Sequence, residues 1–315
     1  MKKMRKKTNF LQLIAVLAIA LYSCDSIEDK KGRFLLKGNE KMAENDPKGA
    51  MQFYAEAIEL DSTYSEAYYN KALAHLQLNQ LGASIADLDL AIQYQTDYYD
   101  AIFQRGLNYL DNGEFYKARE DAQVLLNLDS TNWKSPFLKG LVEERLKNFP
   151  EALQSFEKAT ELNPENSDLL VNQATIRYYQ KNYDEAKALL DKAEALNPNE
   201  PNLYNLRSMI YFDQQSYQPA LEQVEKAITL DNRHAYFYNN KGLYLLFLGQ
   251  QEEGLKLINQ SIQMDPSNPY AMRNKGIYYV MQGDKTSALQ YLEELAVSHP
   301  EMELVSDYLE KAQAL

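Results

Sequence analysis

The side chains that most often carry out catalysis or bind metals are few in this sequence. Its 315 residues include one cysteine, Cys24, and three histidines, His75, His234 and His299. The histidines lie far apart, and none has the short spacing to another histidine or to the cysteine that a zinc site requires. No glycine-rich phosphate loop or nucleophile-elbow motif is present. We therefore predict no catalytic residue, no metal and no cofactor, and we expect that the protein is not an enzyme.

Carboxamide side chains offer a different chemistry. Asn70 and Gln104 are separated by 34 residues, as are Asn240 and Asn274, and Asn172 lies in the same register between the two pairs. A carboxamide both donates and accepts hydrogen bonds, so a row of them can bind the backbone of an extended peptide whatever its sequence. These residues can act together only if the elements that carry them repeat at the same interval.

The 34-residue interval does order most of the chain. Small residues recur at this interval in two columns: Gly38, Ala72, Gly106, Gly140, Ala174, Ser208, Gly242 and Gly276, then Ala50, Ser84, Ala118, Ala152, Ala186, Ala220, Gly254 and Ala288. Unbroken self-similarity of this kind predicts a stacked array in which each unit buries its apolar face on its neighbour. The predicted units are 31–64, 65–98, 99–132, 133–166, 167–200, 201–234, 235–268 and 269–302.

Each unit has a helical pattern. Ala152, Phe156, Ala159 and Leu162 recur at steps of four, three and three, which places them on one helix stripe. Pro47 after Asp46 indicates a helix start, and prolines near the ends of several units indicate helix ends. We therefore predict two antiparallel helices in each unit, which cross where both carry small residues.

These columns resemble the tetratricopeptide repeat family. The fullest matches are "GLNYLDNGEFYKARED" at 106–121 and "PEALQSFEKATELNP" at 150–164. The resemblance covers 31–302 and implies an all-α, right-handed superhelical solenoid of eight helix–turn–helix repeats. The amphipathic segment 303–315 would be a capping helix.

The resemblance also implies a binding groove, because first helices of such repeats line a concave face. The groove would carry the carboxamides named above, and a protein or peptide partner would bind there. The other candidate groove residues are Asn239, Arg273, Tyr69, Phe103, Tyr178, Phe212 and Phe247. The resemblance implies a non-catalytic adaptor, and the N-terminal signal described below would place it in the assembly, secretion or turnover of envelope complexes.

The sequence favours three other functions less. Family members that bind chaperone tails use lysines where this chain has Leu35 and Asp100, and an arginine where it has Gln104, so a C-terminal carboxylate ligand is not expected. A glycan- or nutrient-binding lipoprotein is an alternative, although such proteins carry long insertions that this chain lacks. An enzyme is the third and least favoured.

The N-terminus has the layout of a secretory signal. Residues 1–7 hold five basic residues, and residues 10–21 form an apolar run that is shorter than the roughly 20 residues of a membrane helix. "LYSC" at 21–24 resembles the lipobox of bacterial lipoproteins, which implies a signal peptide at 1–23, lipidation of Cys24 and a short tether at 24–30. An uncleaved anchor helix is the alternative.

Charge and targeting together suggest a location. The net charge is −12, and the basic residues of the predicted signal make the remainder more acidic still, which disfavours nucleic-acid partners. We expect a lipid-anchored protein of the bacterial cell envelope, with the outer membrane favoured and the inner membrane or cell surface left open. The sequence leaves the partner, the pathway and the oligomeric state undetermined.

Overall fold

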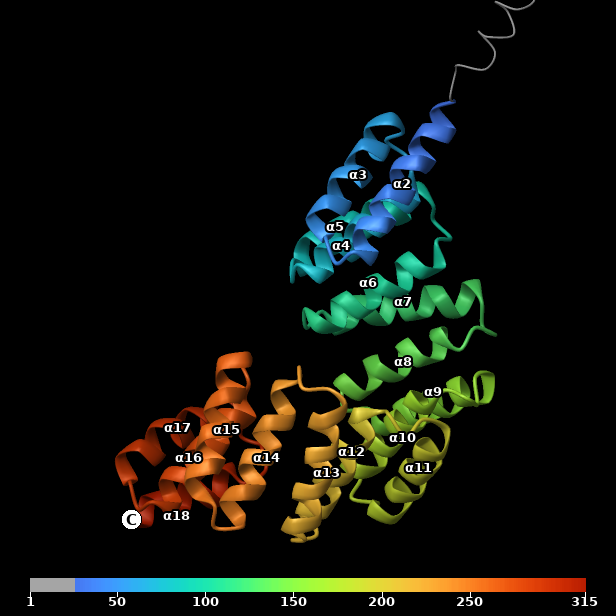
Figure 1. Cartoon of the computed structure of the whole chain (residues 1–315). Coiled ribbons are helices and arrows are strands. Elements are labelled where there is room, and N and C mark those ends of the chain that lie inside the picture. Colours follow the sequence, from blue (N-terminus) through green and yellow to red (C-terminus); the bar gives the residue numbers. More distant parts are fainter. Residues whose placement is uncertain (1–25) are drawn as a thin grey trace, which may run out of the picture. The chain divides into compact units, whose positions relative to one another are not determined.

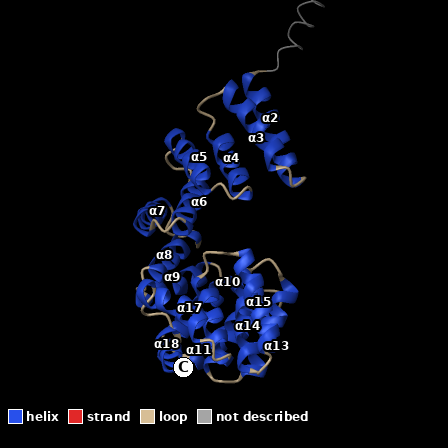
Figure 2. Cartoon of the chain, turned by 90° about the vertical axis from the view of Figure 1, so that its left-hand side faces the viewer, coloured by secondary structure: helices blue, strands red, loops and turns tan. Residues whose placement is uncertain are grey.

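The computed structural model describes residues 26–315, which form helices joined by short turns (Figures 1 and 2). The chain divides into two compact units, one ending at Ser155 and one running from Phe156 to Leu315, and the division falls inside a helix. The predicted all-α array of helix pairs is confirmed for these residues.

The first unit consists of consecutive antiparallel helix pairs. Its helices are α2 (Ile27–Ala43), α3 (Pro47–Leu60), α4 (Ser65–Gln77), α5 (Leu81–Tyr94), α6 (Tyr99–Asp111), α7 (Phe115–Leu128), α8 (Lys134–Arg145) and the start of α9 (Phe149–Leu162). As the sequence predicts, Asp46 caps α3 by accepting a hydrogen bond from the backbone N–H of Gly49 at 2.9 Å, and Pro47 is its first residue.

The second unit repeats the pattern and adds a final helix. It contains the end of α9, then α10 (Ser167–Tyr179), α11 (Tyr183–Leu196), α12 (Pro201–Asp213), α13 (Tyr217–Leu230), α14 (Ala235–Phe247), α15 (Gln251–Met264), α16 (Pro269–Met281), α17 (Lys285–Ser298) and α18 (Val305–Ala314). The helix predicted at 303–315 is therefore present, and it begins two residues later.

The N-terminal boundary of the helices differs from the expected one. The sequence predicts a tether at 24–30, but residues 27–30 form the first turn of α2. Ser26 accepts a hydrogen bond from the backbone N–H of Asp29, and the Asp29 carboxylate accepts one from the backbone N–H of Ser26. This capping box satisfies amide groups that would otherwise fray, so the helix extends beyond the predicted unit boundary.

The turn within each pair also recurs every 34 residues. Left-handed backbone conformations, with φ between 57° and 80°, occur at Asn45, Asn79, Gly113, Lys147, Lys181, Gln215, Gly249 and Gly283. The turns cap the preceding carbonyls, as when the N–H of Gln80 donates to the carbonyl of His75 at 2.9 Å. Three of these positions hold lysine or glutamine, so the regular geometry of the array imposes this conformation even where glycine is absent.

The small columns lie where paired helices touch. Alanines of the second column, including Ala50, Ala118 and Ala220, have no solvent exposure. The tightest pair is α14 with α15, where a Cβ built on Gly242 would lie 2.8 Å from the backbone oxygen of Gly254. Large side chains such as Phe156 and Leu190 fill the remaining volume and are also fully buried.

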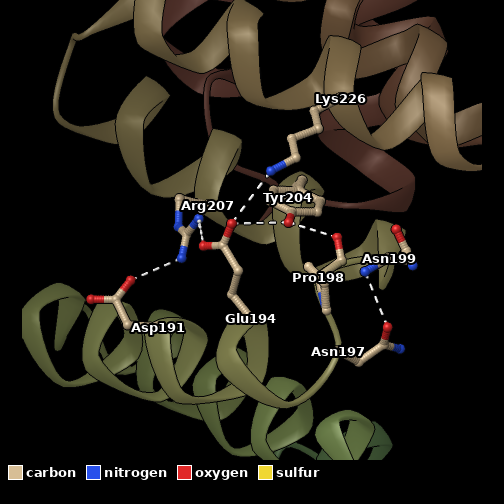
Figure 3. Close-up of polar contacts among 8 residues, drawn as sticks. All are labelled: Asp191, Glu194, Asn197, Pro198, Asn199, Tyr204, Arg207 and Lys226. Carbon is tan, nitrogen blue, oxygen red and sulfur yellow. Dashed lines mark hydrogen bonds and ion pairs between the residues drawn. The ribbon is translucent and has the colours of Figure 1, made fainter.

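Polar clusters join neighbouring pairs at their margins, as in the second unit around Glu194 (Figure 3). This carboxylate accepts hydrogen bonds from Arg207 at 2.7 Å and from the Tyr204 hydroxyl at 3.0 Å, and Lys226 lies 3.3 Å away. Partial burial opposes ionisation of Glu194, but these donors outweigh it and hold its pKa below the ordinary value. The cluster connects α11, α12 and α13, so its role is structural.

Candidate functional site

The predicted row of carboxamides lies on the first helices of successive pairs. Asn70 and Gln104 are on α4 and α6 of the first unit, whereas Asn172, Asn240 and Asn274 are on α10, α14 and α16 of the second. The two units place these residues in different environments, and each is described separately.

In the first unit the two carboxamides are half-buried and bonded only within their own helices. The Asn70 amide donates to the backbone carbonyl of Glu66 at 2.8 Å, and the Gln104 amide donates to the Asn108 side chain at 3.0 Å. Each therefore keeps its side-chain oxygen and a second N–H for another partner. Leu36, at the equivalent position of α2, is 61% exposed.

Aromatic rings lie next to these carboxamides in the sequence. The Tyr69 ring packs 5.2 Å from that of Tyr98, and the Lys134 ammonium lies 5.3 Å above the Phe103 ring. Lys134 is positioned by a 2.8 Å ion pair with Asp100. Both candidate rings are half-buried, and burial raises the pKa of the Tyr69 hydroxyl above its ordinary value. This part of the first unit therefore combines apolar rings with carboxamides whose hydrogen-bonding groups are only partly used.

In the second unit the equivalent residues bond to one another. The Asn274 amide donates to the Asn239 side chain at 2.8 Å, and Arg273 Nε donates to the Asn274 oxygen at 3.0 Å. The Asn240 amide donates to the Asn205 side chain at 2.9 Å. Asn239 is only 1% exposed and Arg273 only 7%. This network joins α12, α14 and α16, and the prediction that its members bind a partner stays a prediction.

The first residue of the second-unit row behaves differently. Asn172 donates to the backbone carbonyl of Asp168, in its own helix, at 2.7 Å and is half-buried. It therefore resembles Asn70 in its bonding rather than the paired asparagines that follow it.

The aromatic candidates of the second unit also pack on one another. The Phe212 ring lies 5.1 Å from both Phe247 and Tyr244, and Tyr178 is buried in the same hydrophobic cluster. Burial raises the pKa of Tyr178 well above its ordinary value. Offset and edge-on ring pairs of this kind stabilise a core.

Sequence reasoning missed two members of these clusters, Asn205 and Tyr244. Asn205 precedes Asn239 by 34 residues, and Arg273 follows by another 34, so the column of polar residues was available as a signal. Tyr244 had no such signal, because its partner Ser208, whose hydroxyl lies 3.0 Å from the Tyr244 hydroxyl, is known only from the fold.

The histidines lie in separate surroundings. His75 Nε2 is 3.3 Å from the Asp87 carboxylate, and His234 Nε2 is 3.4 Å from that of Asp231. Among residues 26–315, no three histidine, aspartate, glutamate or cysteine side chains are grouped closely enough to hold a metal ion. The same part of the chain contains no helix with the length and apolarity needed to cross a bilayer. Cys24 and the predicted signal peptide lie outside the described residues.

Comparison with sequence families gives consistent matches. Models described as tetratricopeptide repeat match residues 65–98 and 201–234, residues 103–167 and 239–303, and residues 145–210. Together they span most of the chain between residues 65 and 303. No curated protein matches the chain.

Solved structures share the arrangement of helices. A tetratricopeptide repeat protein from Parabacteroides merdae matches with a TM-score of 0.68 and 19% identity, over 79% of this chain and 98% of its own. Yeast Tom70 matches with a TM-score of 0.60 and 20% identity, over 90% of this chain and 64% of its own. A chain of the APC/C hetero-tetramer Cut9–Hcn1 matches with 0.67 and 16%, over 93% and 58%. This chain thus spans less than two thirds of the last two, and at these identities the likeness concerns the fold.

Proposed function

Because the chain belongs to the tetratricopeptide repeat family, we propose that it is a non-catalytic scaffold that binds an extended segment of a partner protein on α4 and α6. One observation carries the proposal. Asn70 and Gln104 are partly exposed beside Tyr69 and Phe103, and their bonding groups are only partly used. Carboxamides would bind the partner's backbone, and the rings would contact its side chains.

The comparisons support binding of a protein partner. One of the similar solved structures is itself a complex, the hetero-tetramer Cut9–Hcn1. The first unit of this chain has the chemistry for such a role, since its free hydrogen-bonding groups lie on regular, well-packed helices that would not need to be ordered on binding.

A site-specific cross-linking experiment tests where the partner binds. A photoreactive amino acid at position 69 of the full chain, activated in cells, should capture the partner, and the same group at the exposed Tyr116 of α7 should not. The double change Asn70→Ala and Gln104→Ala should then weaken binding of the captured segment about thirty-fold, because two lost hydrogen bonds at about 1 kcal/mol each remove about 2 kcal/mol. Calorimetry with the purified segment would measure the loss.

The second helices provide a matched control. Gln123 and Asn127 on α7 form an exposed carboxamide pair at 3.1 Å, four residues apart like Gln104 and Asn108. Replacing both by alanine should leave affinity unchanged. Equal weakening by the two double variants would show that the partner does not use the first helices.

We also propose that the protein is a lipoprotein of the bacterial envelope, anchored through Cys24. The support is the order of basic segment, apolar run and "LYSC" motif in the sequence. Because the N-cap of α2 is Ser26, only Asp25 lies between Cys24 and this cap, so the helices would lie directly at the membrane surface. More than one acyl chain is needed for stable anchoring, as bacterial lipidation would supply.

Replacing Cys24 by serine should abolish anchoring and leave the helices folded. Residues 26–315 contain no cysteine with which Cys24 could form a disulfide, so the fold of the helices does not depend on its thiol. A clickable palmitate analogue should label the wild-type chain and not the Cys24→Ser variant, and the variant should move from the membrane to the soluble fraction. Persistent labelling of the variant would exclude Cys24 as the anchor.

A further inference from the structure

The segment just before α18 contacts the end of α10, the first complete helix of the second unit. Lys181, directly after α10, forms a 2.5 Å ion pair with Glu303, which lies 122 residues later and just before α18. The backbone carbonyl of Glu303 also accepts a hydrogen bond from Arg273 of α16 at 3.1 Å. One residue at the start of the last helix thus joins both ends of the row formed by α10, α12, α14 and α16, which we name the first-helix row.

The apolar side of the last helix packs on α16 and α17, and its tyrosine also reaches α14 of the row. Val305, Tyr308 and Ala312 recur at steps of three and four and are buried, and Tyr308 is 7% exposed. The Tyr308 ring lies 6.5 Å from that of Phe247, and it belongs to the same hydrophobic cluster as Tyr178. α18 therefore lies against Phe247, one of the candidate binding residues of the second unit.

The connection to α18 is under local backbone strain. Leu304 adopts φ 67°, and within residues 26–315 it is the one left-handed position outside the regular 34-residue series. A leucine disfavours this conformation, which surrounding contacts must enforce. Both partners of the ion pair that holds this turn are more than half exposed, so that contact is weak.

We propose that α18 is a displaceable internal occupant of the first-helix row, and that the row accepts a partner's amphipathic helix in its place. The expected partner helix has the chemistry of the segment it replaces, namely an acidic residue at its start and an aromatic residue on its apolar side. Lys181 would receive the acidic side chain, Arg273 the backbone carbonyl of the same residue, and the ring of Phe247 the aromatic residue. This inference rests on the proposed function and adds a second, covered surface to the open one in the first unit.

The contact between Glu303 and Lys181 distinguishes this role of α18 from that of a simple capping helix. A cap needs only to shield the last pair, α16 and α17, and α18 does lie beside both (Figure 1). The contact of Glu303 with Lys181, after α10, is not needed for that purpose. It adds to the buried contacts of α18 a surface ion pair with the end of α10, which a competing acidic residue could replace.

A peptide with the sequence of residues 301–315 provides the probe. In the fragment Asp25–Leu315, which contains every described helix, Tyr308→Ala should release α18. The labelled peptide should then bind this variant at least ten-fold more tightly than the wild-type fragment, as measured by fluorescence anisotropy. A peptide carrying alanine in place of Tyr308 should lose this binding. The variant Glu310→Ala, on the exposed side of α18, should behave as wild type.

Hydrogen exchange of the amides in α18 reports release independently. Should Tyr308→Ala unfold the unit, Glu303→Lys offers a milder change, which should raise peptide affinity about two- to five-fold because the ion pair is exposed. Adding Lys181→Glu should restore the wild-type value by exchanging the charges. If exchange shows α18 released while the peptide fails to bind, or if neither variant releases α18, the inference is wrong. These measurements use no partner protein, so they leave the cross-linking test at position 69 unaffected.

Discussion

Replacing Gly242 by alanine is expected to destabilise the second unit by about 3 kcal/mol. The added methyl would lie 2.7 Å from Ile258 Cγ1, 2.8 Å from the backbone oxygen of Gly254 and 3.1 Å from the backbone nitrogen of Ile258. Two of these atoms belong to the backbone of α15, so no side-chain rotation can relieve the contact. The two helices would have to separate, and their shared core would lose its close packing.

Gly82 provides the matched control on α5. A Cβ built there has no heavy atom within 4 Å, so alanine should stabilise the helix by about 0.5–1 kcal/mol through its better helix propensity. Because the chain has two units, hydrogen exchange at α14 and α15 should accompany urea denaturation to locate the effect. Similar stability of the two variants would contradict the close approach of α14 and α15.

Replacing Asp121 by alanine is expected to destabilise the first unit by about 3 kcal/mol. Asp121 on α7 forms two hydrogen bonds with Arg105 on α6, from Nε at 3.0 Å and from Nη2 at 2.6 Å, and its side chain is 4% exposed. Burial raises the pKa of this carboxyl group even beside Arg105, because the carboxylate has lost most of its contact with water. Its removal would leave the half-buried guanidinium without its main partner.

Asp89 provides a control that distinguishes the contribution of burial to stability from that of charge. It pairs with the same arginine at 2.7 Å, but its side chain is 51% exposed. Asp89→Ala should therefore change the free energy of unfolding by less than about 1 kcal/mol. Thermal and urea unfolding of both variants would test this difference, and an equal loss would mean that charge rather than burial determines the contribution.

The first of these predictions concerns a contact that the 34-residue interval made visible. Glycine at 242 and 254 and the alanines of the same columns indicated where helices cross, and the structure places them there. The family and the all-α array followed from the same columns, because each helix pair contacts mainly its neighbours in the chain. When each repeat contacts only its neighbours, the repeat of the structure appears as a repeat in the sequence.

The candidate site was less accessible to sequence reasoning. Asn70, Gln104 and Asn274 occupy equivalent positions, yet the first two keep free bonding groups and the third is fully buried. Equivalent positions share a face of the helix, but the neighbours beyond that face determine exposure. For Asn274 the decisive neighbour is Asn239, whose side chain approaches only because α14 and α16 lie close together, whereas Arg273 belongs to the same helix as Asn274.

The sequence by itself determined the helix pairs, their turns and the positions that could form a binding row. Only the tertiary structure decided which of those positions are open, because that depends on contacts between residues far apart in the chain. The pairing of Lys181 with Glu303 bridges 122 residues and closes the last helix over the second unit. No period in the sequence records such a contact, since it occurs once and depends on how several helix pairs stack together.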